Sequence, residues 1–397
     1  MSKNMLPKGF LAGGVHCGIK RFKKDLALIY SRTGCKAVGV FTKNRVKAAP
    51  LTVSKDILKK AAPIRAVVVN SGNANCCTGW YGVRDAKRMI NAVCRNLKLK
   101  FNSVLVSSTG IIGKRLPIGM LEEAIPELAE KISQKGLVAA ASAILTTDKK
   151  MKISVEKFEI GTKQVIVSGF AKGAGMIHPN MATMLCFLMT DARIDKGALK
   201  SALKKTCDES FNAITIDGDM STNDMVLLMA GGLAGNKTIK KGTKEYRAFL
   251  KALEKVTSKL ARDIISDGEG ATKFVTVCVE GARTSGDAEK AARAVANSCL
   301  VKTSIHGENP NWGRIASAVG ASGVKDVKQN RFEIYLDGIL VFKKGKFITP
   351  AKAKFSKIYK RKNVEIIINL NMGKKEAVIR TCDLSKRYVE INSHYMT

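Results

Sequence analysis

Residues 171–189 join a loop with almost no side chains to an uninterrupted apolar run. The loop contains Gly173 and Gly175, and glycine allows backbone conformations and close approaches that other residues do not. The apolar run, residues 184–189, has the length and composition of a buried strand. Thr183 therefore lies where a flexible loop meets a rigid element, a suitable place for a nucleophile. The alternative is that Thr183 is an ordinary residue of a core strand.

The composition indicates a soluble globular protein with two or more domains. The chain has 397 residues, of which 45% are hydrophobic and 25% are charged, enough for more than one sizeable core. Its amino terminus lacks the apolar core and cleavage site of a signal peptide. The longest apolar runs, such as 137–145 and 226–230, are far shorter than a membrane span. We therefore expect a cytoplasmic protein without a membrane partner.

The strong positive charge raises the question of a nucleic-acid partner. The chain has 68 Lys and Arg against 33 Asp and Glu, a formal net charge of +35, and clustered basic residues favour phosphate binding. Here the basic residues are spread along the whole chain. The densest segment, 342–363, also carries Phe347, Phe355 and Tyr359, which could stack on bases, but no nucleic-acid module surrounds them. We expect no nucleic-acid partner, and a field that attracts carboxylate substrates is the preferred interpretation.

The cysteines and histidines predict no metal site. The ten cysteines are scattered, with one adjacent pair, Cys76-Cys77, and no Cys-x-x-Cys spacing. The four histidines are dispersed, so neither residue type shows metal-ligand spacing. Reduced, mostly buried thiols are expected.

Hydrophobic periodicity predicts a mixed α and β fold with a β-rich carboxyl-terminal end. The predicted strands cover residues 64–70, 103–106, 152–160, 163–169, 184–189, 213–216, 274–280, 331–342, 364–370, 376–382 and 388–392. The predicted helices cover residues 86–97, 122–131 with Pro126 near its start, 137–145, 196–207, 246–264 with Thr243 as the cap, and 288–299.

Two glycine motifs suggest nucleotide binding, but neither has the required pattern. The segment 173–175 lacks a third glycine and leads into a strand, whereas a dinucleotide fingerprint opens a helix. The segment 268–270 precedes alanine, threonine and lysine in the wrong order for a phosphate loop.

Asp217, Asp219 and Asp224 lie in one polar loop, which lacks the register and closing Glu of a calcium loop. A polar turn is the preferred interpretation, in which Asp217 and Asp219 could support an active site from behind.

His178 is followed directly by Pro179, which holds it extended, so His178 is expected to shape the loop and not to act as a base.

Ten short segments, in order along the chain, together resemble one enzyme family. They are residues 70–75, 108–110, 146–148, 172–177, 179–185, 217–224, 267–273, 301–303, 310–314 and 388–392. The sequence is similar to the ornithine acetyltransferase (glutamate N-acetyltransferase) family of arginine biosynthesis over essentially its full length. The resemblance implies a layered α-β-β-α sandwich of the self-cleaving, N-terminal-nucleophile kind, with a smaller β-rich carboxyl-terminal domain.

The resemblance also implies cleavage of the precursor between Ala182 and Thr183. The products are residues 1–182, which carry the oxyanion loop, and residues 183–397, which begin with the nucleophile. They are expected to stay associated, as a heterotetramer of two chains of each kind. Cleavage would give Thr183 a free α-amine with a pKa of about 8, well suited to general-base catalysis, and a threonine paired with its own terminal amine is an activated nucleophile.

By the same resemblance, the hydroxyl of Thr183 takes the acetyl group from N2-acetylornithine and passes it to glutamate. Thr109 and Gly110 are expected to form the oxyanion hole, in which donors are worth roughly 3–4 kcal/mol each. The substrate contacts implied by position are either Thr146 or Thr147, together with Lys172, Thr183, Glu269, Asn392 and Thr397. Within this set we expect Lys172 to bind a carboxylate and Glu269 an ammonium group. No cofactor is expected, although acetyl-CoA could serve as a second acetyl donor.

Two alternatives stay open at this point. One is a self-cleaving aminopeptidase or amidohydrolase of similar architecture, and the other is a basic nucleic-acid-binding protein. The sequence departs from the family pattern at 149–151, where a small residue or Thr and then a Pro-Lys pair are expected, and at His306 and His394. These departures concern local shape and not the nucleophile.

Overall fold

The computed structural model describes residues 5–60, 62–178 and 184–394. The predicted cleavage position, Thr183 and Thr397 lie outside the described residues. The strands of the first sheet are β1 (Phe10–Val15), β2 (Leu26–Phe41), β3 (Ile64–Asn73), β4 (Val104–Ile111), β5 (Lys152–Ile160), β6 (Lys163–Lys172), β7 (Leu185–Thr190) and β8 (Met225–Ala230). Those of the second sheet are β9 (Phe274–Ala282), β10 (Glu333–Leu336), β11 (Ile339–Lys343), β12 (Lys346–Phe347), β13 (Asn363–Asn369) and β14 (Lys375–Cys382).

The α-helices are α1 (Ala49–Lys59), α2 (Gly79–Leu97), α3 (Ile118–Lys131), α4 (Leu137–Ala143), α5 (Lys196–Glu209), α6 (Lys244–Ser266), α7 (Ser285–Asn297), α8 (Cys299–His306), α9 (Trp312–Gly320), α10 (Lys352–Phe355) and α11 (Lys386–His394). Short 3-10 turns cover Phe101–Ser103 and Phe211–Ala213. Thr243 caps α6 as predicted, because its side chain accepts a hydrogen bond from Tyr246 N.

The first sheet folds over on itself at the long strand β2. Its strand order is β4-β3-β2-β8-β7-β6-β5, with β1 beside β2. Residues 26–30 of β2 pair with β3, and residues 36–41 pair with β8 after a change of register. Pairs β3–β4 and β7–β8 are parallel, and the others in this sheet are antiparallel.

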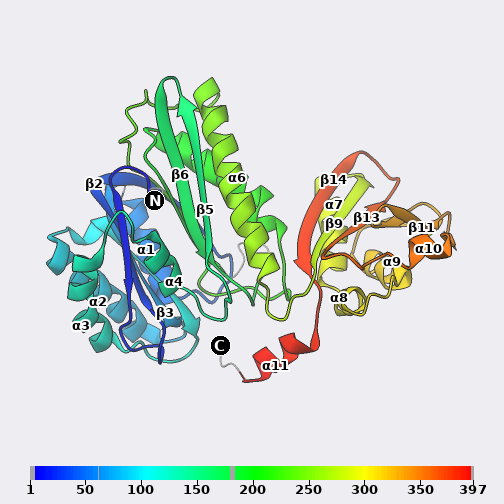
Figure 1. The fold of residues 1–397 in the computed structure, drawn as a ribbon, viewed down its shortest axis with the longest axis horizontal. Helices are drawn as coiled ribbons and strands as arrows, with labels where there is room; N and C mark the ends of the chain where they lie inside the picture. Colours follow the sequence, from blue (N-terminus) through cyan, green and yellow to red (C-terminus); the bar gives the residue numbers. More distant parts are fainter. Residues whose placement is uncertain (1–4, 61, 179–183, 395–397) are drawn as a thin grey trace.

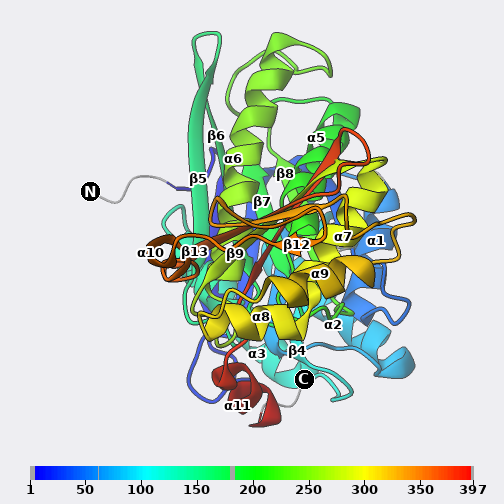
Figure 2. The ribbon, with the colours of Figure 1, turned by 90° about the vertical axis from the view of Figure 1, so that its right-hand side faces the viewer.

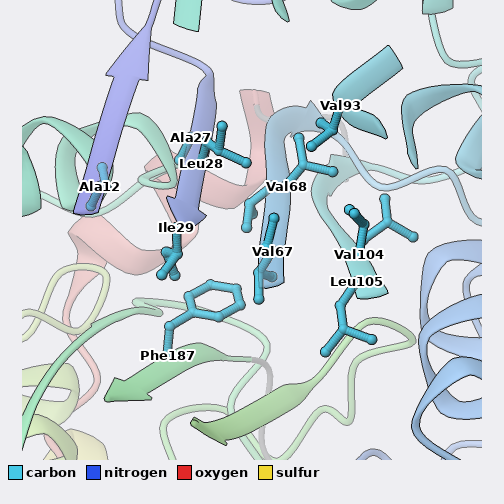
Figure 3. Packing of buried hydrophobic residues seen from close by; sticks show 14 of the residues in the cluster. Ala12, Ala27, Leu28, Ile29, Val67, Val68, Val93, Val104, Leu105 and Phe187 are labelled. Carbon is cyan, nitrogen blue, oxygen red and sulfur yellow. The ribbon is translucent and has the colours of Figure 1, made fainter. Parts of the chain in front are cut away.

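Residue alternation along β7 shows that the two halves of this sheet face each other. Phe187 and Met189 belong to the core shared with β2, β3 and β4, and in Figure 3 Phe187 lies among Ile29, Val67 and Leu105. The intervening residues of β7 belong instead to the core formed with α5 and α6. Because α2 and α3 cover the other half, the layers run helix, sheet, sheet, helix, which confirms the predicted sandwich.

The second sheet forms a smaller body with α7, α8 and α9, at the right of Figure 1 and nearest the viewer in Figure 2. Its strand order is β12-β11-β10-β13-β9-β14, and only β9–β13 is parallel. Tyr359 is fully buried here, and Trp312 stacks on Phe342 and Phe347. The β-rich carboxyl-terminal part predicted from the sequence is therefore present.

Several predicted elements were wrong. Residues 388–392 belong to helix α11 and not to a strand. Residues 213–216 contain no strand, and Ile214 makes only an isolated bridge to Arg380. The predicted strand at 331–342 is a hairpin that turns at Asp337 and Gly338, both with positive φ. Pro126 lies inside α3, which begins eight residues earlier, at Ile118.

Helix α11 forms because this part of the chain has no neighbouring strand. Tyr, Val and Ile favour strands, but a strand needs a hydrogen-bonding partner, whereas a helix satisfies its own backbone. None of the residues of α11 is buried, and Val389 is 63% exposed. In Figure 1 this helix lies below both sheets, apart from the other elements.

Candidate active site

A pocket of about 180 Å³ lies where the loops of both sheets and α11 converge. Its lining residues are Thr109, Gly110, Ile112, Thr146, Thr147, Lys172, Gly175, Met176, Asp217, Asp219, Ser221, Thr222, Asn223, Glu269, Tyr388 and Asn392. The structure thus brings together every predicted oxyanion and substrate residue that lies within the described part of the chain. Both Thr146 and Thr147 reach the pocket, so the sequence alternatives there are both present.

Thr109 and Gly110 lie near the end of strand β4, at the pocket wall. Gly110 has φ +134°, and a Cβ there would lie 2.3 Å from the backbone carbon of Gly72 on β3. Only glycine allows this close approach of the two parallel strands. Ser108 is held on both sides, since its hydroxyl donates to Asn70 and its carbonyl accepts from Asn223. This end of β4 is therefore rigid, as a preorganised oxyanion site requires.

Lys172 ends strand β6 and is 4% exposed. Its ammonium group donates to Thr109 Oγ1 at 3.3 Å, which ties the predicted carboxylate-binding residue to the predicted oxyanion residue. Burial lowers the pKa of Lys172, although Asp148, Glu269 and Asp224 oppose this. A buried ammonium group without a paired anion is costly, so this site favours the binding of a negatively charged group.

Glu269 lies in the loop between α6 and β9 and supplies negative charge to the pocket. Its backbone N–H donates to Ala174 O at 2.8 Å, and its Oε2 accepts from Asn392 Nδ2 on α11 at 2.8 Å. A Cβ on Gly175 would lie 2.4 Å from Glu269 Oε2. The glycine-rich loop therefore makes room for this carboxylate and does not cradle a phosphate.

Asp217 organises the polar loop at residues 217–224, which forms another part of the pocket wall. Its carboxylate accepts from the backbone N–H groups of Met176, Ile177 and Asp219, at 2.6, 2.8 and 3.2 Å. The Tyr388 hydroxyl also lies 3.3 Å from it. Burial raises the pKa of Asp217 to about 6, with these hydrogen bonds acting in the opposite direction. These hydrogen bonds fit the polar-turn interpretation, but Asp217 and Asp219 themselves line the pocket and do not lie behind it as expected.

His178 is half-buried, and its Nδ1 lies 3.5 Å from the amide of Asn297 on α7. Burial, and then the charge of Arg293, lower the pKa of His178. His178 is not among the pocket-lining residues. This contact fits the predicted role in shaping the loop.

The strand that follows the predicted cleavage position is anchored at its first described residue. Met184 N donates to Asp224 Oδ1 at 3.0 Å, and Met184 O accepts from Met225 N. Asp224 is buried, which raises its pKa. The roles predicted for Ala182, Thr183 and Thr397 fall on residues outside the described ranges and stay predictions.

Sequence reasoning missed two features of the site. Tyr388 lines the pocket one helical turn from Asn392, and this i, i+4 spacing would have been informative only with α11 predicted as a helix. A buried ion cluster lies behind Thr146 and Lys172, in which Lys152 bridges Asp148 and Asp267. The pattern of polar and apolar residues along the strand that begins at Lys152 does not indicate that its side chain is paired with two buried carboxylates.

The described residues contain neither a metal-binding cluster nor a disulfide. Within them, no group of three or more His, Cys, Asp or Glu side chains is placed to hold a metal ion. All ten cysteines are free thiols. No helix of the described ranges is long and apolar enough to cross a membrane.

The fold and the pocket define an α/β protein with a small polar pocket that is lined by side chains of both signs of charge. The chain belongs to the ArgJ family, whose model matches residues 11–397. It is 48% identical over 396 residues to the arginine biosynthesis bifunctional protein ArgJ of Caldanaerobacter subterraneus subsp. tengcongensis, covering 99% of this chain and 98% of that protein. The ArgJ protein of Thermotoga neapolitana is 46% identical over 397 residues, with 99% and 100% covered. The crystal structure of an ArgJ protein from Bacillus halodurans matches with a TM-score of 0.50 and 40% identity, covering 53% of this chain and 98% of that chain.

Proposed function

We propose that this protein moves the acetyl group of N2-acetyl-L-ornithine to L-glutamate in arginine biosynthesis, through an acetyl-threonine intermediate at Thr183. The observation that carries the proposal is the convergence of Thr109, Gly110, Lys172 and Glu269 on one pocket of a chain in the ArgJ family. Curated relatives over the whole chain are named arginine biosynthesis bifunctional proteins.

N2-acetylornithine carries an α-carboxylate and a side-chain ammonium group, and the pocket offers a partner for each of them. Lys172 would hold the α-carboxylate, and Glu269 with Asn392 would hold an ammonium group. The hydroxyl of Thr183 attacks the acetyl carbonyl, ornithine leaves with its nitrogen protonated, and the acetyl group stays as an ester. The amine of glutamate then attacks that ester and leaves as N-acetylglutamate. Thr109 and Gly110 would stabilise the oxyanion in both steps.

The architecture supports cleavage into two chains that stay together. A cut between Ala182 and Thr183 would put β6 and β7 on different chains, yet these strands pair from Lys172 to Leu185 onward. In addition, β2 of the first chain pairs with β8 of the second. The Bacillus halodurans chain is covered almost fully by about half of this one, as expected if that protein also consists of two chains. A heterotetramer, a cytoplasmic location and the use of acetyl-CoA belong to the same proposal.

The test is a kinetic assay of the purified protein with N2-acetylornithine, with and without glutamate. We expect sustained ornithine release only when glutamate is added, with parallel initial-rate plots that indicate a ping-pong mechanism. Sustained release without glutamate would support the hydrolase alternative instead. Salt-sensitive binding to duplex DNA without acetyl transfer would contradict the proposal altogether.

Two further measurements address the finer parts of the proposal. Thr183→Ala should abolish both acetyl transfer and the appearance of two fragments on a denaturing gel. Formation of N-acetylglutamate from acetyl-CoA and glutamate, without acetylornithine, would establish bifunctional activity.

A further inference from the structure

Lys172 is a buried cation without a carboxylate partner of its own in the described part of the chain. Its ammonium group contacts the neutral hydroxyl of Thr109. No carboxylate oxygen of the described residues lies within 4.0 Å of it. A buried charge normally requires a close counter-ion, so its absence here needs a structural cause.

Asp148, the carboxylate whose charge acts most strongly on Lys172, is taken by a different lysine. Asp148 Oδ1 accepts from Lys152 Nζ at 2.6 Å and from Gly173 N at 2.7 Å, and its Oδ2 accepts from Thr146 N at 3.1 Å. Asp148 also lies close to Lys172. Burial opposes its ionisation, but the charges of Lys172 and Lys152 outweigh this and lower the pKa of Asp148 to about 2.

Lys152 is held in place by a second carboxylate. Its ammonium group lies 2.6 Å from Asp267 Oδ2, and its side chain is 1% exposed. Asp267 Oδ2 also accepts from the backbone N–H groups of Lys149 and Lys150. The ammonium group of Lys152 is thus fixed between two anions and cannot turn toward solvent.

We propose that Lys152 is a positioning residue which, by pairing with Asp148 and Asp267, keeps Lys172 free to bind the α-carboxylate of the substrate. This inference rests on the proposed function, since it assigns Lys172 to the substrate carboxylate. Without Lys152, Lys172 would be the strongest remaining cationic neighbour of Asp148 among the described residues, although the charge of Lys20 also reaches Asp148. The resulting internal ion pair would compete with the substrate.

The test compares substrates with an α-carboxylate and with an α-carboxamide in the variant Lys152→Met. In the wild type we expect a strong preference for the carboxylate in kcat/KM, because a charge-assisted contact to Lys172 is made only with it. In Lys152→Met the preference should fall roughly tenfold or more, mainly through a higher KM for the carboxylate substrate. Equal losses on both substrates would show a mere packing role and overturn the proposal.

Two variants serve as controls. Lys150→Met alters an exposed neighbour whose backbone, and not its side chain, contacts Asp267, and it should keep the wild-type preference. The double variant Lys152→Met with Asp148→Asn removes one buried charge of each sign, so it also covers the case in which Lys152→Met alone does not fold. It should keep the preference within about threefold of wild type, because a neutral amide at position 148 leaves Lys172 unpaired.

A folded double variant that loses the preference tenfold would contradict the proposal. A wild-type protein without any acetyl transfer would instead contradict the proposed function, so the two failures are distinguishable.

Discussion

Gly175 shows how one missing side chain sets the geometry of the pocket. The carboxylate of Glu269 occupies the space that a Cβ at this position would fill, with Oε2 at 2.4 Å. Glu269 is also held by Asn392, so a Cβ at position 175 would displace the carboxylate from this hydrogen bond. The need for glycine here is steric and depends on a residue far later in the chain.

Gly175→Ala is expected to reduce kcat/KM for acetyl transfer at least roughly tenfold and to destabilise the fold by about 1–3 kcal/mol, the usual cost of overpacking. Enzyme assays and thermal melts would measure both effects. The matched control is Gly119→Ala on helix α3, where a Cβ meets nothing within 4 Å and alanine favours the helix. Full activity in Gly175→Ala would show that Glu269 moves without cost.

The buried charge of Asp148 makes a pH-dependent contribution to stability. Its pKa is lowered from 3.8 to about 2 in the folded protein, so the folded state favours the ionised form. The stabilisation is complete above pH 4 and is lost as the pH falls toward 2, with a size of about 2 kcal/mol by linkage. Chemical denaturation of the wild type and of Asp148→Asn should show a stability difference that shrinks by this amount between pH 5 and pH 2. A stability difference that stays constant between pH 5 and pH 2 would contradict the lowered pKa of Asp148.

At the scale of elements, helix α11 contributes to the wall of the pocket but is not part of the hydrophobic core. It contributes Tyr388 and Asn392 to the lining, yet it buries none of its residues. Contact with the rest of the protein is made through polar groups, among them Asn392 with Glu269 and Tyr388 with Asp217. Binding and stability should therefore respond differently to changes in this helix.

Val389→Pro should raise KM for both substrates by roughly tenfold while lowering the melting temperature by no more than about 2 °C. Proline at an interior helix position costs about 3 kcal/mol locally, but unfolding of an exposed helix with no buried side chains has little effect on the global transition. Steady-state kinetics and calorimetry separate the two effects. Val389→Ala is the control, since it keeps the helix. A large drop in melting temperature for the proline variant would mean that α11 stabilises the whole fold.

At the scale of the whole molecule, the order of strands interleaves the two halves of the chain. Strand β7 lies between β6 and β8, and β8 in turn pairs with β2. After a cut behind Ala182, the pairs β6–β7 and β2–β8 would each join strands of different fragments. Both pairs lie within one continuous sheet, which is buried between helices on either side. Separation of the fragments would require disruption of the sandwich core.

The cleaved protein should therefore elute as a single species in size-exclusion chromatography and give two fragments only under denaturing conditions. Refolding from denaturant should require both fragments together, because neither contains all the strands of the first sheet. Thr183→Ala is the control, which should give one uncleaved chain with the same elution volume. Release of either fragment in native buffer would contradict this account.

The sequence was sufficient for the class of fold, for most helices and strands of the central sandwich, and for part of the pocket lining: Thr109, Gly110, Thr146, Thr147, Lys172, Glu269 and Asn392. Buried strands and amphipathic helices have local patterns, and the short loop motifs stand in order along the chain. Residues such as Lys172 and Glu269 could therefore be assigned before their positions in space were known.

Only the tertiary structure decided features that depend on residues far apart in the chain. Residues 388–392 have strand propensity, but they form a helix because no strand lies beside them. The role inferred for Lys152 depends on Asp267, 115 positions away, and the space at Gly175 depends on Glu269. Local sequence determines which elements can form, whereas the availability of partners determines which of them do form and which charges remain free for a substrate.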